Sequence, residues 1–544
     1  MDNGSRTGEL HGARLVRFGC FAFAALLIVA ALYCRIRLLS VPLERDEGGF
    51  AYIGQQLLNG IPPYVSGNMK VLAGIHFAYA VIMALFGESS AGIHAGLLAV
   101  NTASMVLLYF LARRILPIEG ASVAVGVFAF LSVTPSVLGI FAHATNFVIL
   151  FILAGLVTMM AGLKRNRLSL ILASGACFGL SVLMKQHGVF FCLFACGYLF
   201  WELQARKQGL QSTLRHFSLL FLGMLVPYAA TCAYMWANGV FGEFWFWTVT
   251  RSLDYATEIP LSVGLHRLKS YVGTVPQNVL LFWYLAGGGL IALRYRDCRI
   301  RHRWFVVFFL CASIAAILPG LTFYPHYFIL LLPAVSILAG IAFVALTQIP
   351  VPVPAQSARR QAAVALMLLA ACFGIYQQRG YLFTIKPVAI SRMIYGGNPF
   401  PESIEIARYI REHSIPGTQI AVLGSEPQIY FYANRPSATD YLFMYPLVEQ
   451  QPHVEQMQDE MIREIEQAYP EFIVLVGIPS SWLYQSEAGA RLIKWADTYL
   501  SGNYHKVGII ELLSSSQTNY YWGRDAEERK VSSKLFIVLF QRNS

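Results

Sequence analysis

Long apolar runs, separated by short basic clusters, constrain this chain more than any other feature of its sequence. Most runs are about 17–22 residues long, close to the length of an α-helix that crosses a bilayer. Charged residues make up 13% of the 544 residues, whereas a soluble domain holds about a quarter. We therefore predict a polytopic α-helical membrane protein with about eleven spans, at residues 18–39, 92–112, 119–139, 147–163, 168–185, 188–203, 216–236, 277–293, 304–321, 327–346 and 362–378.

Basic residues predict the orientation of these spans, because loops on the cytoplasmic side carry an excess of Lys and Arg. If all the clusters face the cytoplasm, eleven spans alternate without contradiction, with the N-terminus inside and the residues after the last span outside. The clusters are Arg14/Arg17, Arg113/Arg114, Lys164/Arg165/Arg167, Arg206/Lys207/Arg215, Arg294 through Arg303, and Arg359/Arg360.

One apolar run, residues 71–87, breaks this alternation. Counted as a span, it would place Arg113 and Arg114 outside, so we interpret it as an interfacial or re-entrant helix on the outer side. A true span with inverted topology downstream is the alternative. The first run, residues 18–39, is too long for a signal peptide and is predicted to stay as an uncleaved span.

The composition changes after the last span, which predicts a membrane domain at residues 1–378 and a soluble α/β domain at residues 379–544. The second part holds most of the acidic residues and no cysteine, so it has neither a disulfide nor a thiolate metal site. It could be a lid, an acceptor-recognition domain or a passive support. Its predicted strands are residues 419–424, 471–477, 506–512 and 534–541, and its helices are residues 401–414, 453–468 and 487–500.

The net charge of +11 does not indicate a nucleic-acid partner, because the basic residues are spread over short clusters between apolar runs. The polar residues at the predicted outer ends of the spans are more informative. Asp46 and Glu47 come just after the first span, before residues 48–58, which read as an amphipathic helix. A carboxylate held at the membrane surface can act as a base or bind a cation, although a solvated loop is the simpler interpretation.

Two lysines, Lys70 and Lys185, fall at outer ends of apolar stretches. Each alone could be a lysine that reaches toward the headgroups, but two on the same face as two acids favour an anion site such as a phosphate. Aromatic residues of the outer loop 237–276 favour an interfacial helix, and sugar binding is a weaker alternative. Further predicted site residues on the outer face are His143, Asn146, Tyr324, His326 and Tyr327, with interfacial anchoring as the alternative for the last three.

Several segments resemble one family of membrane enzymes. They are RDEGGFAYIGQQLLNGIPPY with the following Lys70, FYPHYFILLLPAVSILAG, and GSEPQIYFYANRPSATDYLF in the tail. Together they resemble the GT-C glycosyltransferases, in particular bacterial relatives of protein O-mannosyltransferases and of the lipid A aminoarabinose transferase. The resemblance covers essentially the whole chain and is most specific at the Asp-Glu loop.

This resemblance implies a polyprenyl-phosphate-linked sugar donor, used outside the cytoplasmic membrane, and a glycan, lipid or protein acceptor. It implies Asp46 as the catalytic residue, with Glu47 beside it. It also implies donor-phosphate contacts from Lys70, Lys185, Tyr324 and His326, with His143, Asn146 and Tyr327 lining the site.

The chain departs from the family pattern at two places. Lys70 is followed by Val71 and Leu72 rather than closely by proline, and the second outer turn carries His143 and Asn146 where a second acid is common. A two-carboxylate or metal-dependent scheme is therefore in doubt, and the need for a divalent metal stays open. The implied mechanism is a single inverting displacement at the anomeric carbon.

Two other functions stay open at this point, namely a transporter or flippase of lipid-linked glycans and a non-catalytic assembly subunit. Transporters usually carry internal repeats and polar residues at mid-membrane, and this sequence has neither pattern. A bacterial inner membrane is the predicted location, and a eukaryotic secretory membrane is the alternative.

Overall fold

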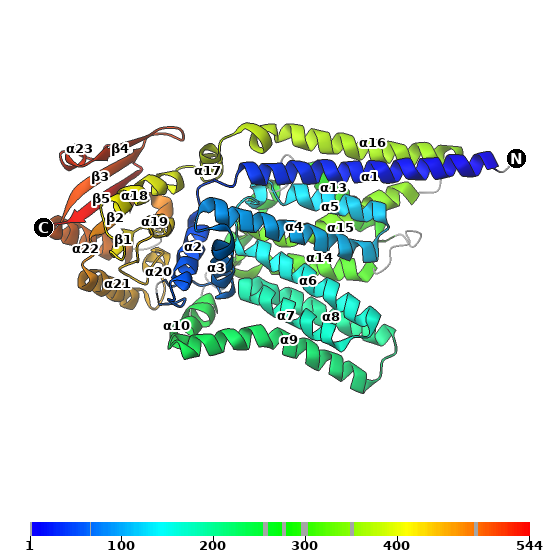
Figure 1. The fold of residues 1–544 in the computed structure, drawn as a ribbon, viewed down its shortest axis with the longest axis horizontal. Coiled ribbons are helices and arrows are strands. Elements are labelled where there is room, and N and C mark those ends of the chain that lie inside the picture. The colour runs from blue at the N-terminus through cyan, green and yellow to red at the C-terminus, as the bar shows by residue number, and fades with distance from the viewer. Residues whose placement is uncertain are drawn as a thin grey trace. The chain divides into compact units, whose positions relative to one another are not determined.

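The computed structural model describes residues 3–65, 67–253, 259–274, 279–294, 303–348, 353–483 and 488–543 (Figure 1). The chain forms two compact units, each built from separate stretches of sequence. Unit 1 holds residues 1–38, 94–234 and 251–385, and unit 2 holds residues 39–93, 235–250 and 386–544. Each unit is described by itself below.

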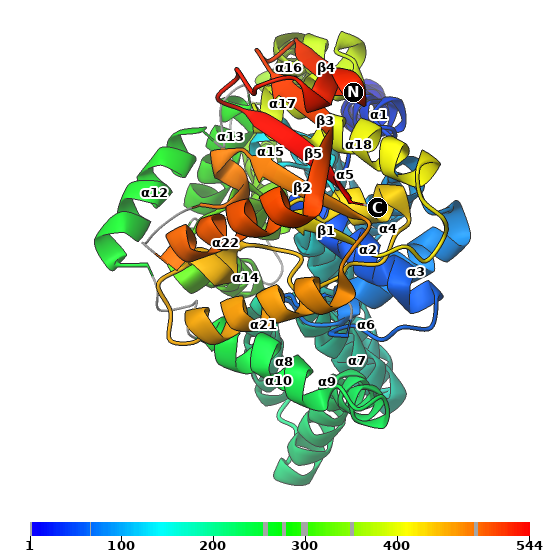
Figure 2. The ribbon, with the colours of Figure 1, turned by 90° about the vertical axis from the view of Figure 1, so that its left-hand side faces the viewer.

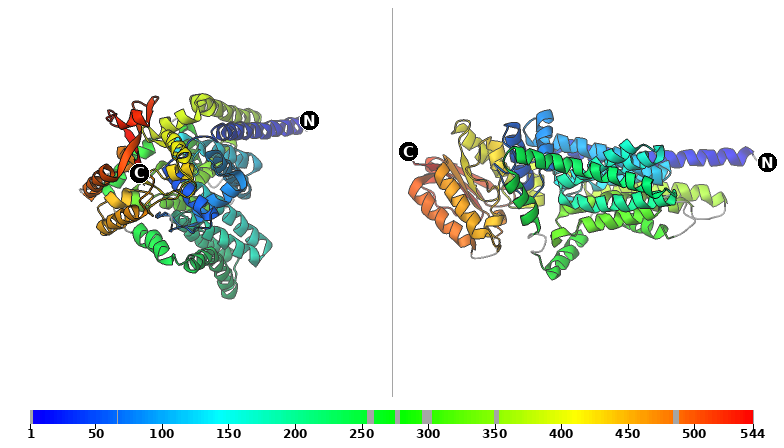
Figure 3. Two further views of the ribbon diagram at one scale, coloured as in Figure 1. Left: turned by 60° about the vertical axis from the view of Figure 1, so that its left-hand side comes forward. Right: turned by 90° about the horizontal axis from the view of Figure 1, so that it is seen from below.

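Unit 1 is a bundle of helices that lie side by side in Figures 1 and 3. Helix α15 is the most enclosed, because every residue from Leu332 to Val344 is buried. Small residues let its neighbours approach closely: a Cβ added to Gly340 would lie 2.4 Å from the Gly120 carbonyl oxygen, as expected where membrane helices pack without bulky side chains. The helices are α1 (Asn3–Arg37), α4 (Ser90–Ile115), α5 (Ile118–Leu131), α6 (Ala144–Arg165), α7 (Leu168–Met184), α8 (Val189–Ala205), α9 (Leu210–Ala237), α12 (Leu261–Thr274), α13 (Leu280–Ala292), α14 (Arg303–Ala316), α15 (Leu332–Gln348) and α16 (Val353–Gln377).

The predicted spans correspond to helices of this bundle. Seven helical segments among the described residues are long and apolar enough to cross a membrane, and they belong to α1, α4, α6, α8, α9, α15 and α16. The other four predicted spans correspond to the shorter apolar helices α5, α7, α13 and α14. The predicted class, a polytopic helical membrane protein with a C-terminal domain that contains strands, is therefore confirmed. Residues 295–302 of the cluster from Arg294 to Arg303, and parts of loop 237–276, lie outside the described residues.

The apolar run at 71–87 forms helix α3 (Gly74–Phe86), which belongs to unit 2. It packs on α2 (Arg45–Leu58), the amphipathic helix predicted at residues 48–58, through Phe50, whose ring centroid lies 5.5 Å from that of Tyr79. Unit 2 also contains α10 (Phe241–Trp245) and the π-helical turn Phe246–Thr250, from the aromatic part of loop 237–276.

A five-stranded mixed sheet forms the centre of unit 2, in the order β1-β2-β5-β3-β4 (Figure 2). Strands β1 and β2 are parallel and the other pairs are antiparallel. Residues 420–423 of β1 are all buried, as their aliphatic run predicts. The four predicted strands and three predicted helices are present. The strands are β1 (Ile420–Leu423), β2 (Phe472–Gly477), β3 (Tyr504–Leu512), β4 (Thr518–Trp522) and β5 (Phe536–Arg542), and the helices are α17 (Pro387–Tyr395), α18 (Phe400–Glu412), α19 (Gln428–Ala433), α20 (Tyr445–Val448), α21 (Val454–Ala468), α22 (Ala488–Asn503) and α23 (Arg524–Glu527).

Helix α2 belongs to the same compact unit as the sheet, although it is far from the strands in the sequence. A Cβ on Gly48 would lie 2.6 Å from the backbone nitrogen of Gln428, so the two backbones are in close contact. The Tyr52 hydroxyl accepts a hydrogen bond of 2.8 Å from the Ser437 amide. The predicted division between residues 378 and 379 stays a prediction, and the unit that contains the sheet also takes in residues 39–93.

Candidate active site

The predicted catalytic carboxylates lie in the first turn of α2, in unit 2. Glu44 is the N-cap residue, and its side chain accepts a hydrogen bond of 2.8 Å from the Glu47 amide. The Glu47 carboxylate in turn accepts one of 3.2 Å from the Glu44 amide, which completes a capping box. Glu44 and Glu47 are buried, whereas Asp46 is half-exposed. Asp46 is therefore the carboxylate of this turn that an acceptor can reach most readily.

Burial raises the pKa of Glu44 well above its ordinary value, and the nearby carboxylates of Asp46 and Glu47 raise it further. A protonated Glu44 would reduce the repulsion among three acids in one turn.

Lys70 has a carboxylate partner in its own unit. Its ammonium group lies 3.2 Å from Glu449, and both side chains are mostly buried. The predicted contact between Lys70 and a donor phosphate stays a prediction, and it would require Lys70 to exchange or share this partner.

A second polar cluster lies in unit 1, around Lys185, which follows the last residue of α7. The Lys185 ammonium nitrogen is 3.3 Å from His326 Nε2 and 4.2 Å from the ring centroid of Tyr327. His326 and Tyr327 belong to a 3₁₀ turn, Pro325–Leu331, whose proline occupies the first helical position. The structure therefore brings these three residues together, and their predicted contact with a donor phosphate stays a prediction.

Histidine rings extend this cluster. The His143 ring stacks on His326, with centroids 4.1 Å apart and planes at 14°, and Tyr324 stacks on His326 at 5.9 Å. His187 packs edge-on against Tyr327 at 4.7 Å. It is buried, and neither of its ring nitrogens has a hydrogen-bond partner among the described residues. His187 was not among the predicted site residues, although it lies two positions after Lys185.

His143 and Asn146 sit at the start of α6. Burial, together with the nearby Lys185 charge, lowers the pKa of His143 to about 3, so the ring is neutral near pH 7. The Asn146 side-chain amide donates to the carbonyl oxygens of Phe141 and His143, at 3.3 and 3.4 Å. Asn146 therefore supports the turn that carries His143. Its predicted role in lining the site for an acceptor stays a prediction.

The Lys185 cluster has the composition of an anion site. In the described part of unit 1, the carboxylates of Glu119 and Glu202 form ion pairs with Arg17 and Arg206. Neither pair involves a residue of the cluster. One ammonium group, neutral imidazoles and tyrosine hydroxyls are groups that donate hydrogen bonds to phosphate oxygens.

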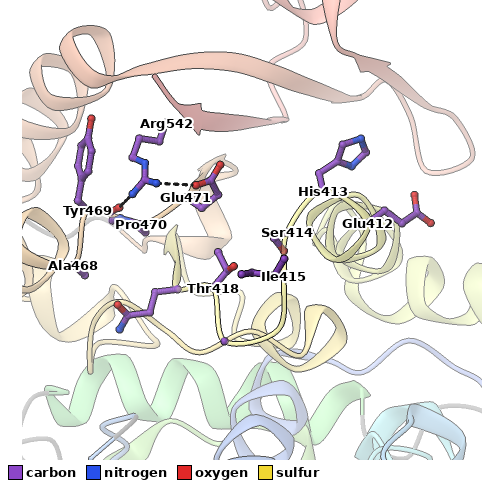
Figure 4. A pocket seen from close by; sticks show the side chains of 12 residues that line it. Glu412, His413, Ser414, Ile415, Thr418, Ala468, Tyr469, Pro470, Glu471 and Arg542 are labelled. Atoms are coloured by element: carbon purple, nitrogen blue, oxygen red, sulfur yellow. Dashed lines mark hydrogen bonds and ion pairs between the residues drawn. The ribbon is translucent and has the colours of Figure 1, made fainter. Parts of the chain in front are cut away.

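A surface hollow of about 630 Å³ in unit 2 contains none of the predicted site residues (Figure 4). Arg542 points across it toward Glu471, 3.1 Å away, and donates to the Tyr469 carbonyl oxygen at 3.0 Å. Because these polar groups pair with one another, the hollow offers little unmatched charge to a ligand.

Comparison with known proteins supports the predicted resemblance. A family model described as dolichyl-phosphate-mannose-protein mannosyltransferase matches residues 74–231. The fold resembles ArnT from Cupriavidus metallidurans, solved bound to undecaprenyl phosphate, with a TM-score of 0.58 and 15% identity over 95% of this chain and 97% of that one. Among curated protein sequences, none matches this chain.

A second similar structure is the archaeal oligosaccharyltransferase AglB from Archaeoglobus fulgidus, solved with an inhibitory peptide and a dolichol-phosphate. Its TM-score is 0.51 at 12% identity, over 92% of this chain and 74% of that one. These likenesses establish a fold shared with GT-C glycosyltransferases, as the sequence predicted.

Proposed function

We propose that this protein is a membrane glycosyltransferase that moves a sugar from a polyprenyl-phosphate carrier to an acceptor hydroxyl. The observation that carries the proposal is the Lys185 cluster, which can hold a phosphate, in a fold shared with ArnT and AglB. Those two structures were solved with undecaprenyl phosphate and with dolichol-phosphate, respectively. We further propose that the transferred sugar is a hexose or a pentose. The acceptor is a glycan, a lipid or a protein.

In this mechanism Asp46 accepts the proton of the acceptor hydroxyl as its oxygen attacks the anomeric carbon. The bond between that carbon and the phosphate oxygen breaks, and polyprenyl phosphate leaves with the electron pair. Lys185 stabilises the charge that develops on the phosphate, aided by Tyr324 and His326. Lys70 would bind the same phosphate if its ion pair with Glu449 breaks. One displacement inverts the anomeric configuration.

The location of the reaction follows from the charge pattern of the loops. We infer that the N-terminus and the basic clusters face the cytoplasm of a bacterial inner membrane, and that the C-terminal domain is extracytoplasmic. Tagging each end and testing its accessibility to a reagent that does not cross membranes would check this orientation.

Transfer by the purified protein tests the function. Wild-type protein in lipid nanodiscs is incubated with a membrane extract as acceptor and with radiolabelled hexoses and pentoses, linked either to polyprenyl phosphate or to a nucleotide. We expect transfer from a lipid-linked donor and none from the matching nucleotide sugar. Transfer from nucleotide sugars alone would contradict the proposal, and movement of the intact lipid-linked sugar between leaflets without transfer would favour a flippase.

A further inference from the structure

Arg45, the first residue of α2, donates three side-chain hydrogen bonds to residues 353 to 381 positions later in the chain. Its Nε donates to the Ser425 carbonyl oxygen, and its Nη2 donates to the Glu426 carboxylate and, at 3.0 Å, to Asn398 Oδ1. The guanidinium carbon also lies 5.6 Å from the ring centroid of Phe400. Arg45 therefore ties the turn that carries Asp46 to the segment that follows β1.

Burial of the Glu426 carboxylate costs free energy. Its side chain is fully buried, and it accepts hydrogen bonds from Arg45 and, at 2.7 Å, from Gln428 Nε2. A buried carboxylate persists only where it is paired and hydrogen-bonded, so Glu426 depends on Arg45 as Arg45 depends on Glu426. The planar guanidinium group of Arg45 holds its N–H donors in fixed positions, which makes arginine suited to buried ion pairs.

The turn that carries Glu426 is itself held in place. The Ser425 amide donates to Ser481 Oγ at 2.7 Å, and the Ser425 hydroxyl accepts from the Met444 amide at 2.9 Å. Ser480 also donates to Asn398, at 2.8 Å, and so supports the second acceptor of Arg45. The sheet unit thus presents a fixed set of acceptors to one guanidinium group.

We propose that Glu426 is a positioning residue that holds Asp46 in its reactive place by anchoring Arg45. The proposal rests on the function proposed above. It assigns a role to the C-terminal domain, whose residues support the turn that carries Asp46. A displacement of about 1 Å can cost roughly a hundredfold in rate, so a loosened turn would slow the reaction.

Charge gives a second reason for the same role. Glu426 neutralises Arg45 at a site next to Asp46. With a neutral side chain at position 426, the guanidinium would lose its buried counter-charge and be drawn toward the Asp46 carboxylate of its own turn. An Asp46 paired with Arg45 is a weaker base.

The chain offers a matched control in the ion pair between Arg392 and Glu402. The exposed fractions of these side chains are 9% and 2%, against 13% and 0% for Arg45 and Glu426. Glu402 bonds with Arg392 and with the Thr518 hydroxyl, both outside α2. Arg392 also donates to the Asn398 carbonyl oxygen at 2.7 Å. Glu402→Gln therefore removes a comparable charge pair from the same unit and leaves every side-chain acceptor of Arg45 in place.

The test compares Glu426→Gln with Glu402→Gln in the transfer assay, at equal folded yield. We expect Glu426→Gln to lower kcat by about tenfold or more, with KM for donor and acceptor within about threefold of wild type. Glu402→Gln should lower the melting temperature similarly and leave kcat within about threefold. A normal kcat for Glu426→Gln, or equal losses in both variants, would overturn the proposal.

Amide hydrogen exchange supplies a readout that does not depend on activity. In Glu426→Gln, residues 45–50 should exchange about tenfold faster than in wild type, and in Glu402→Gln they should not. If wild type transfers no sugar, the function proposed above fails while exchange still reports whether the anchor exists. If Glu426→Gln does not fold, Arg45→Gln/Glu426→Gln, which removes both charges, replaces it with the same expected loss of kcat. Unchanged exchange in the first turn of α2 would overturn the anchoring role.

Discussion

The two units of this protein carry opposite kinds of polar site. In unit 1, a lysine and neutral imidazoles gather at the ends of apolar helices, around Lys185 and His326. In unit 2, three acids occupy one helical turn, beside an arginine whose charge Glu426 neutralises. We propose that residues of the bundle hold the donor phosphate and that Asp46 of the sheet unit is the base. The difference suggests that the donor phosphate and the acceptor hydroxyl are handled by groups that fold in different parts of the chain.

The clearest way to break this comparison is to change the carboxylates of unit 2 one at a time. Asp46→Asn should lower kcat by about a hundredfold or more, because general-base catalysis is worth about 10²–10⁴. Glu47→Gln should keep most activity, since glutamine also completes a capping box. Initial rates at saturating donor and acceptor measure both. A collapse in Glu47→Gln with a normal Asp46→Asn would reverse the assignment.

Substitution of Lys185, the cation of the unit 1 cluster, should affect use of the donor. Lys185→Ala should lower kcat/KM for the donor by about tenfold to a hundredfold, as expected for the loss of a hydrogen bond to a charged group. Lys185→Arg should recover part of this loss, because arginine also binds phosphate. Lys164→Ala, at the opposite end of the bundle helices, is the control. Equal losses in Lys164→Ala and Lys185→Ala would argue against a phosphate role for Lys185.

The smallest predicted effect concerns a buried acid far from this chemistry in sequence. Burial, together with the nearby acids Glu464, Glu460 and Glu243, raises the pKa of Asp440 to about 7. Since this folded-state value lies above that of the unfolded chain, Asp440 lowers stability increasingly as pH rises from about 4 to about 7.

Asp440→Asn should therefore raise the melting temperature of the purified protein by about 2–4 °C at pH 8 and by less at pH 5. Thermal unfolding at the two pH values measures the difference. An equal change at both would show that Asp440 has an ordinary pKa.

The helices and most of the strands could be predicted because their signals are local. The length of each apolar run predicts a span, and the aliphatic runs at residues 420–423 and 472–477 predict buried strands. Strand β4 was missed because its residues, Thr518 to Trp522, lack an aliphatic pattern and are only partly buried. The capping box was readable, since Glu44 and Glu47 have the required spacing of three.

The pairings that define the site were not readable from the sequence. Lys70 bonds to Glu449 and Arg45 to Glu426 across more than 370 positions, and charge alone does not select a partner among 30 acids. The close approach of Gly48 to Gln428 likewise depends on tertiary packing.

The stereochemistry of transfer tests the central claim, that Asp46 acts as a base in a single displacement. A donor of defined anomeric configuration is turned over by wild-type protein, and the configuration of the new glycosidic bond is read from proton NMR coupling constants. The account predicts inversion. Retention would require two displacements through a covalent glycosyl-enzyme, which would contradict the role assigned to Asp46.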